Sequence, residues 1–211
     1  MQSPKPRIIH SAEEVPSALE SLGLDAEIIK FIGESARAAR NETLPIDPIN
    51  AGGTLAYIFG VRAIRNKLLS RGWEKSRQGN IEATVHHEHG IQLWFQNVDK
   101  ACQTSRIPRA ISDKGPGARH LIESGQLDLF NEDNKKRPQK LGSTPTVWVV
   151  CVSSDEESLQ VEVSRPVSFS GKQYDDFDQR IFVLDKRFEP EAITNEHDID
   201  NIEVNITRKQ E

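Results

Sequence analysis

A change in hydrophobic periodicity at Gly72 constrains the fold of this chain more than any other feature of its sequence. Before Gly72, apolar residues recur every three or four positions, which is typical of amphipathic helices. After it, they alternate or form short runs between turn residues, which is typical of strands. Helices followed by closely spaced strands favour an α+β fold over a parallel βαβ fold. We therefore expect an α+β domain with N-terminal helices packed on a mostly antiparallel β-sheet.

Two of the expected helices begin at residues that cap helices well. Ser11 stands three residues before a glutamate, which is the spacing of a capping box, and predicts a helix over 11–22. Asp25 predicts the start of a second helix over 25–40, in which apolar residues recur at helical spacing.

The strongest helical pattern covers residues 53–71. Its first half, 55–59, is apolar nearly all round, which predicts a position in the centre of the fold. Gly72 follows directly, where a glycine commonly ends a helix by adopting a left-handed conformation.

The rest of the chain predicts five strands and one short helix. We expect strands at 81–87, 91–97, 146–152, 159–164 and 180–184, and a helix at 116–124. In the strand at 159–164, apolar residues alternate with Gln160, Glu162 and Ser164, which predicts that one face of this strand is exposed.

Length and composition indicate an ordinary folded protein. The 211 residues suffice for one domain, and we expect a single domain over 1–211 in which 1–10 and 187–211 are flexible or peripheral. No apolar run approaches the roughly 20 residues of a membrane helix, and residues 1–10 lack the pattern of a secretory signal. Two cysteines are too few for a disulfide framework, so we expect a cytoplasmic location.

Charge is distributed unevenly along the chain. The stretch from Arg62 to Arg119 contains 11 Lys/Arg and 5 Asp/Glu, whereas residues 141–211 contain 7 Lys/Arg and 15 Asp/Glu. A basic middle predicts an anionic partner. The alternative is that the two halves face each other or only keep the surface hydrated.

The segment 106–119 (RIPRAISDKGPGAR) is the strongest candidate for a binding site. It brings cations and glycines to the start of an expected helix, where unpaired N–H groups and the helix dipole attract anions. Glycines let the backbone approach a phosphate closely, while lysine offers a point charge and arginine a planar fork. The candidate residues are Arg106, Arg109, Lys114, Gly115, Gly117 and Arg119. The alternative is a surface loop whose glycines only serve turns, since the spacing is not that of a P-loop.

Arg62 and Arg65 form a second candidate pair, on the helix expected at 53–71. They are three residues apart and share a face, next to the apolar positions of that helix. Arginines in such a place line a cleft, pair with buried acids, or extend along apolar surface to solvent. The sequence leaves all three roles open.

Metal sites and cofactor sites have weaker support. His87 and His89 would point the same way on a strand, but they lie at an expected turn and no second Cys/His cluster accompanies them. We therefore expect no metal site there. The motifs of dinucleotide-binding proteins, serine hydrolases and metalloproteases are missing, so the sequence names no cofactor and no catalytic residue.

A metal-dependent nuclease of divergent sequence stays open as an alternative. Such enzymes place one acid on a strand and a second acid near a lysine on the next. Here the acids would be Glu82 and Asp99, together with Lys100 or Lys114.

Three parts of the sequence resemble a family of bacterial proteins that occur on plasmids and other mobile elements. These parts are RAIRNKLL at 62–69 with the following Gly72-Trp73, the segment from Pro108 to Gly115, and the strand pattern TVWVVCV, LQVEVSRPVSF and FDQRIFVLD. The resemblance carries no established activity. It implies a bacterial or phage context and favours a role connected with nucleic acid, such as anti-phage defence, over small-molecule metabolism.

We therefore expect a protein that binds nucleic acid or another phosphate-bearing ligand in a defence or mobile-element context. The nuclease is one alternative. The other is a protein–protein interaction module whose contact is the acidic C-terminal segment, residues 195–211.

Overall fold

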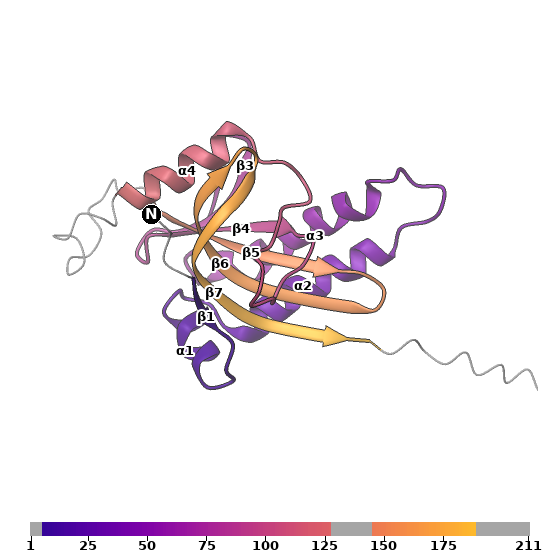
Figure 1. Ribbon diagram of the computed structural model, residues 1–211, viewed down its shortest axis with the longest axis horizontal. Helices are drawn as coiled ribbons and strands as arrows, with labels where there is room; N and C mark the ends of the chain where they lie inside the picture. Colours follow the sequence, from indigo (N-terminus) through magenta and orange to yellow (C-terminus); the bar gives the residue numbers. More distant parts are fainter. Residues whose placement is uncertain (1–5, 128–144, 189–211) are drawn as a thin grey trace, which may run out of the picture.

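The computed structural model describes residues 6–127 and 145–188, which form one seven-stranded sheet with helices on both faces (Figure 1). In chain order the elements are β1 (Arg7–Ile9), α1 (Glu14–Glu20), α2 (Ala26–Asn41), α3 (Ala51–Leu68), the 3-10 turn η1 (Leu69–Arg71), β2 (Glu74–Gln78), β3 (Ile81–His86), β4 (Ile91–Asn97), α4 (Pro116–Leu127), β5 (Thr146–Ser154), β6 (Ser158–Ser170) and β7 (Gln173–Arg187). The expected α+β class is confirmed.

The sheet is mixed, so the expectation of a mostly antiparallel sheet is wrong. Its strand order is β1-β7-β6-β5-β4-β3-β2, in which β1 pairs parallel with β7 and β4 pairs parallel with β5. The other four neighbouring pairs are antiparallel. The chain between β4 and β5 contains α4, and such a crossover is what parallel neighbours require.

The helix ends follow the local signals in the sequence. Just before α1, the Glu14 N–H donates to Ser11 Oγ over 3.2 Å, and the Ser11 hydroxyl donates to Glu14 Oε2 over 3.0 Å. Asp25 accepts a hydrogen bond from the Ile28 N–H at 2.8 Å. Gly72 has φ of 83°, the left-handed conformation in which glycine ends a helix without strain.

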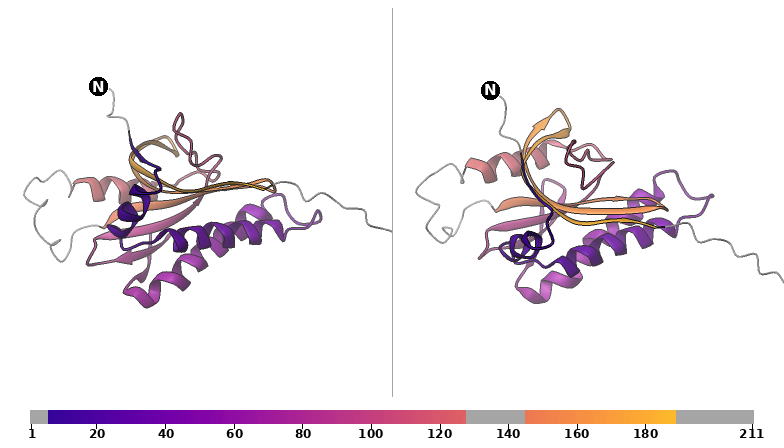
Figure 2. Two further views of the ribbon diagram at one scale, coloured as in Figure 1. Left: turned by 90° about the horizontal axis from the view of Figure 1, so that it is seen from below. Right: turned by 60° about the horizontal axis from the view of Figure 1, so that its bottom comes forward.

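Two hydrophobic cores lie on opposite faces of the sheet (Figure 2). The first core joins α1, α2 and α3 to one face, and includes Leu19, Ile29, Ile64, Phe95, Val150 and Val161. The second core joins α4 and the segment after β4 to the other face, and includes Trp94, Ala101, Ile122, Val149, Cys151 and Phe177. Because β4 and β5 contribute to both cores, almost every residue in them is buried.

The expected central position of α3 is wrong. One side of α3 packs in the first core through Ala56 and Ile64, whereas Tyr57 and Ile58 on its other sides are 37% and 42% exposed. The apolar character of its first half therefore does not reflect burial on all sides. The loop before α3 also exposes apolar side chains, since Ile46 is 89% exposed.

The expected exposed face of β6 is also wrong. Glu162 and Ser164 are completely buried, and Gln160 is 8% exposed. The segment after β4 covers this face: the Ala101 N–H donates to Gln160 Oε1, and the Cys102 N–H donates to Glu162 Oε2. The alternation of apolar and polar residues in β6 therefore reflects one apolar face and one polar face, both of which are buried.

Among the described helices, none combines the length and the hydropathy that a membrane crossing requires.

Candidate functional site

A buried ion pair between β6 and β7 positions the segment that leads to the candidate site. Arg180 donates to both carboxylate oxygens of Glu162, at 2.9 and 2.7 Å, and both side chains are almost completely buried. The guanidinium also donates to the backbone carbonyls of Gln103 and Arg106, at 2.8 and 2.9 Å. Arg180 therefore ties the segment after β4 to the sheet.

Cys102 belongs to the same network. Its backbone has φ of 53°, and its N–H donates to Glu162 Oε2 at 2.6 Å. Burial, followed by the negative charge of Glu162, raises the pKa of the Cys102 thiol far above the usual range. Its Sγ lies near the Val161 and Leu184 carbonyls, at 3.4 and 3.3 Å. The thiol is thus a packed structural group.

Asp99 anchors the next part of the segment and neutralises one of the expected binding cations. Its carboxylate accepts hydrogen bonds from the Lys100 and Arg109 N–H groups and pairs with the Arg106 guanidinium. Arg106 is therefore engaged within the fold. The Arg109 side chain is exposed and makes no ion pair or side-chain hydrogen bond in the part of the chain that the structure describes.

Bulges bend the β6–β7 hairpin so that its tip reaches α4. The β6–β7 register shifts at several points between Val161 and Phe169, and such irregularities curve a strand pair. The tip curls back to the N-terminal end of α4 (Figure 1). There the Lys114 N–H donates to the Lys172 carbonyl at 3.0 Å, and the Arg119 guanidinium donates to the Gly171 carbonyl at 2.6 Å.

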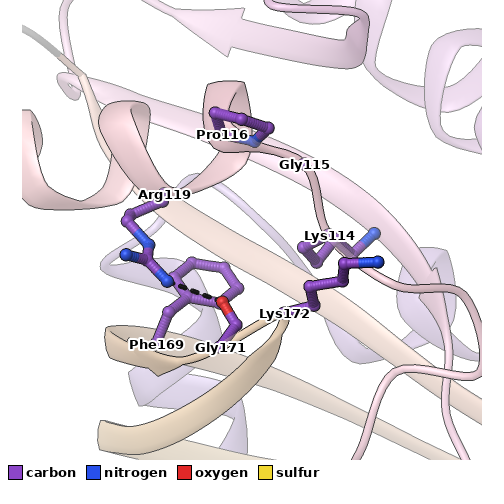
Figure 3. Close-up of a pocket in the computed structure, with 7 residues that line it drawn as sticks. All are labelled: Lys114, Gly115, Pro116, Arg119, Phe169, Gly171 and Lys172. Atoms are coloured by element: carbon purple, nitrogen blue, oxygen red, sulfur yellow. Dashed lines mark hydrogen bonds between the residues drawn. The ribbon is translucent and has the colours of Figure 1, made fainter.

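The space between this tip and the start of α4 is a pocket of about 320 Å³, which we call the α4 pocket (Figure 3). Its lining consists of Lys114, Gly115, Pro116, Arg119, Phe169, Gly171 and Lys172. Within the described ranges, three cations and no carboxylate line it. Such a pocket favours an anion.

Lys114 is the most unusual residue of the α4 pocket. Its side chain is largely buried, and it makes no ion pair or side-chain hydrogen bond with any described residue. Burial lowers the pKa of Lys114 to about 8, because a charged ammonium group loses hydration there. By contrast, Lys172 is exposed and pairs with Asp113 at 3.1 Å.

The two glycines of the candidate segment have different surroundings. A side chain at Gly115 would meet no atom within 4 Å, so Gly115 leaves the mouth of the pocket open. A Cβ at Gly117 would lie 2.6 Å from the Gly79 carbonyl oxygen. Gly117 therefore allows close packing of α4 on the β2–β3 turn, and it does not line the α4 pocket.

The structure does not bring Arg62 and Arg65 to this pocket. Both lie on α3, which packs in the first core, whereas α4 belongs to the second core on the opposite face of the sheet. Arg65 pairs with Glu82 at 2.6 Å, and the Arg62 guanidinium lies 4.4 Å from the centre of the Phe59 ring. Arg65 thus pairs with an acid, which is one of the roles that the sequence left open, while Arg62 is exposed beside Phe59.

The two acids of the nuclease alternative lie apart and are engaged. Glu82 is paired with Arg65 and also with Arg77 at 3.3 Å. Glu82 lies on β3, next to the Ala83–Trp94 pair, whereas Asp99 lies in the segment that follows the end of β4 at Asn97. Over residues 6–127 and 145–188, no group of three or more His, Cys, Asp and Glu could hold a metal ion. The nuclease alternative gains no support from this geometry.

Two histidines at the β3–β4 turn, His86 and His89, pack against each other, and His86 packs edge-on against Trp73. The His86 ring lies 5.3 Å from the Trp73 ring and 4.4 Å from the His89 ring. Burial, with a further contribution from the charge of His89, lowers the pKa of His86. His87 is exposed, 3.7 Å from Glu74. This cluster packs the turn against the end of α3.

Sequence reasoning missed the hairpin side of the α4 pocket. Phe169, Gly171 and Lys172 lie outside the strands expected from periodicity, because β6 and β7 extend well beyond 164 and begin well before 180. The available signal was Ser170-Gly171, a turn dipeptide followed by a cation; Gly171 has φ of 61°.

Comparisons of the chain with protein-family models, curated proteins and solved structures found no match.

Proposed function

We propose that this protein binds a phosphate-bearing ligand in the α4 pocket. The observation that carries the proposal is that Lys114, Arg119 and Lys172 all line one pocket whose described lining contains no carboxylate, while Lys172 also pairs with Asp113 beside it. Cations that line a pocket attract a phosphate.

The surroundings of Lys114 add support. A largely buried ammonium group without an anionic partner is unfavourable, and a bound phosphate would supply the missing charge and hydrogen-bond acceptors. Arg119 uses one N–H group on Gly171, which leaves other donors of its guanidinium available to a ligand.

Calorimetric titration with inorganic phosphate and pyrophosphate at two ionic strengths tests the proposal. We expect saturable binding that weakens with salt, and an affinity about tenfold lower in Lys114→Met. Lys67→Met is the matched control, because Lys67 is an exposed lysine on α3 at the other face of the sheet. Absence of saturable binding at low salt would overturn the proposal.

Protein interaction is the second candidate function. The loop between α2 and α3 exposes Leu44, Ile46 and Ile49 by 60%, 89% and 107%, and Ile58 on α3 is also exposed. Sedimentation velocity over a range of concentrations tests a second copy of the chain as the partner. Self-association that Ile46→Ser with Ile49→Ser removes would support this function, and a monomer at every concentration would contradict self-association.

The acidic segment at 195–211 lies outside the described residues, so its role as a contact stays a prediction. Co-purification with and without 195–211 tests it. The defence or mobile-element context likewise stays a prediction.

A further inference from the structure

The α4 pocket has two chemically different ends. Figure 3 shows the Phe169 ring and the Arg119 guanidinium at one end, and the side chains of Lys114 and Lys172 at the other. Apart from its three cations, the described lining consists of glycine, proline and phenylalanine, and so offers mainly apolar surface. A bare phosphate would use the cationic end and leave the apolar end empty.

Phe169 is the outermost member of an aromatic row that begins in the second core. The Phe177 ring is completely buried and lies 5.3 Å from the Tyr174 ring, and Tyr174 lies 5.1 Å from Phe169. Phe169 is partly exposed and lines the α4 pocket, so the row ends there. A planar ring bound against Phe169 would extend this row by one member.

Polar atoms without partners accompany this aromatic end. Tyr174 Oη and Gln173 Oε1 are buried and have no hydrogen-bond partner among residues 6–127 and 145–188. Tyr174 contacts Phe169, and Gln173 follows Lys172 of the pocket lining in the chain. Buried polar groups without partners are uncommon in folded proteins, and here they lie behind Phe169 without lining the pocket.

We propose that the α4 pocket takes a nucleotide, with its base stacked on Phe169 and its phosphate between Lys114 and Lys172. This inference rests on the proposed function and adds the class of ligand. The pocket volume of about 320 Å³ lies at the lower end of the range for small-molecule sites, which suits a single nucleotide unit. A stacked ring on one side and an anion on the other are the two features that a nucleotide combines.

We expect the affinity of the proposed site to depend on whether the ligand carries a base, and only weakly on which base it carries. No amide or carboxylate side chain is part of the described pocket lining, so base edges meet few directional partners. Stacking tolerates every base, and a larger ring system stacks over a larger area. We therefore expect adenine and guanine nucleotides to bind within a few-fold of each other and more tightly than uridine nucleotides.

Titration of the full chain with AMP, ribose 5-phosphate and inorganic phosphate tests the inference. We expect AMP to bind about tenfold more tightly than ribose 5-phosphate, which carries the same phosphate and sugar without the base. Phe169→Leu should lower the affinity for AMP about tenfold and leave that for ribose 5-phosphate unchanged, whereas Lys114→Met should lower both. Phe31→Leu, an aromatic substitution on α2 at the other face of the sheet, is the control.

The outcomes separate this inference from the proposed function. Equal affinities for AMP and ribose 5-phosphate, with both reduced in Lys114→Met, would overturn the nucleotide and keep the phosphate site. Absence of binding by all three compounds at low salt would overturn both. If Phe169→Leu does not fold, the fluorescence of 1,N6-ethenoadenosine monophosphate on the wild-type protein decides: quenching on binding supports stacking, and unchanged emission contradicts it.

A nucleotide could reach the pocket as a free molecule or as a unit of a single strand. Titration with a short oligoadenylate, which carries the same base as AMP, distinguishes these sources. Tighter binding of AMP than of the oligonucleotide assigns the pocket to free nucleotides, and the reverse assigns it to a strand; both outcomes keep the same chemistry at Phe169 and Lys114.

Discussion

Lys114 carries its charge where water is largely removed, so its protonation changes the stability of the fold. Its pKa is about 8 in the folded chain against 10.5 for a free lysine. Below pH 8 the ammonium group is charged in both the folded and the unfolded state, so its burial lowers the free energy of unfolding by the full amount. Between pH 8 and 10.5 the folded state loses the proton first, so this reduction disappears as the pH rises.

Substitution of Lys114 by methionine should therefore stabilise the protein most at neutral pH. The increase in the free energy of unfolding should include a pH-dependent contribution, which is about 3 kcal/mol at pH 7 and vanishes near pH 10.5. Urea unfolding of wild type and Lys114→Met between pH 7 and 10.5 measures this contribution. Lys172→Met, at an exposed lysine, should show no such pH-dependent gain; a constant difference for Lys114→Met would contradict the prediction.

The ion pairs Glu162–Arg180 and Arg165–Asp178 join the same two strands in different surroundings. The first is buried, and removal of one partner leaves a charge and several hydrogen-bonding groups unpaired. The second is partly exposed, and water can replace the lost partner. We expect Glu162→Gln to lower the free energy of unfolding by about 3 kcal/mol or more, and Asp178→Asn by less than about 1 kcal/mol. Similar losses in the two variants would contradict this assignment.

At the residue level, the sequence predicts about half of the candidate site. The cations and glycine of the α4 side follow from their position before a helix, because helix starts are local features. Phe169 and Lys172 come from a hairpin whose bend depends on bulges and on contacts with distant α4. Arg106 and Arg65 could not be separated from ligand-binding arginines, since their acidic partners, Asp99 and Glu82, become neighbours only in the fold.

Among the structural elements, α3 contains two glycines that should respond oppositely to alanine. A Cβ at Gly60 would overlap the Phe95 ring of β4, so α3 can lie this close to the sheet only with glycine there. A Cβ at Gly53 would meet nothing within 4 Å. We expect Gly60→Ala to destabilise by about 1–3 kcal/mol and Gly53→Ala to stabilise by about 0.5 kcal/mol, through helix propensity. Chemical denaturation of the two variants measures both changes, and a neutral Gly60→Ala would contradict the close packing.

The helices were more predictable than the strands for a physical reason. The capping residues Ser11, Asp25 and Gly72 act within their own turns, so the sequence contains what determines these ends. The edge strands β1 and β2 and the buried polar face of β6 depend on distant partners. The alternation of apolar and polar residues in β6 is compatible with a solvent-exposed face or with a buried polar face. The polar face is buried because the segment at 98–113 covers it.

For the molecule as a whole, the shared strands β4 and β5 predict a single unfolding transition. Trp94 lies in the second core and Trp148 in the first, on neighbouring strands with side chains on opposite faces. Neither core can open without loss of the strands that support the other. We expect variants that keep only Trp94 or only Trp148 to show fluorescence transitions that coincide with the far-UV circular dichroism of the same variant. Separate midpoints within one variant would indicate two units.

The parallel pairing of β1 with β7 has a consequence for synthesis of the chain. The Arg7–Ile9 strand is synthesised well before its neighbour at 179–181. At roughly 5–20 residues per second, the first strand waits roughly ten to thirty seconds for its partner. Throughout that interval, apolar side chains of α2 lack the β6 surface that covers them in the finished protein. We therefore expect the nascent chain to expose more apolar surface, and to aggregate more readily, than the compactness of the final fold suggests.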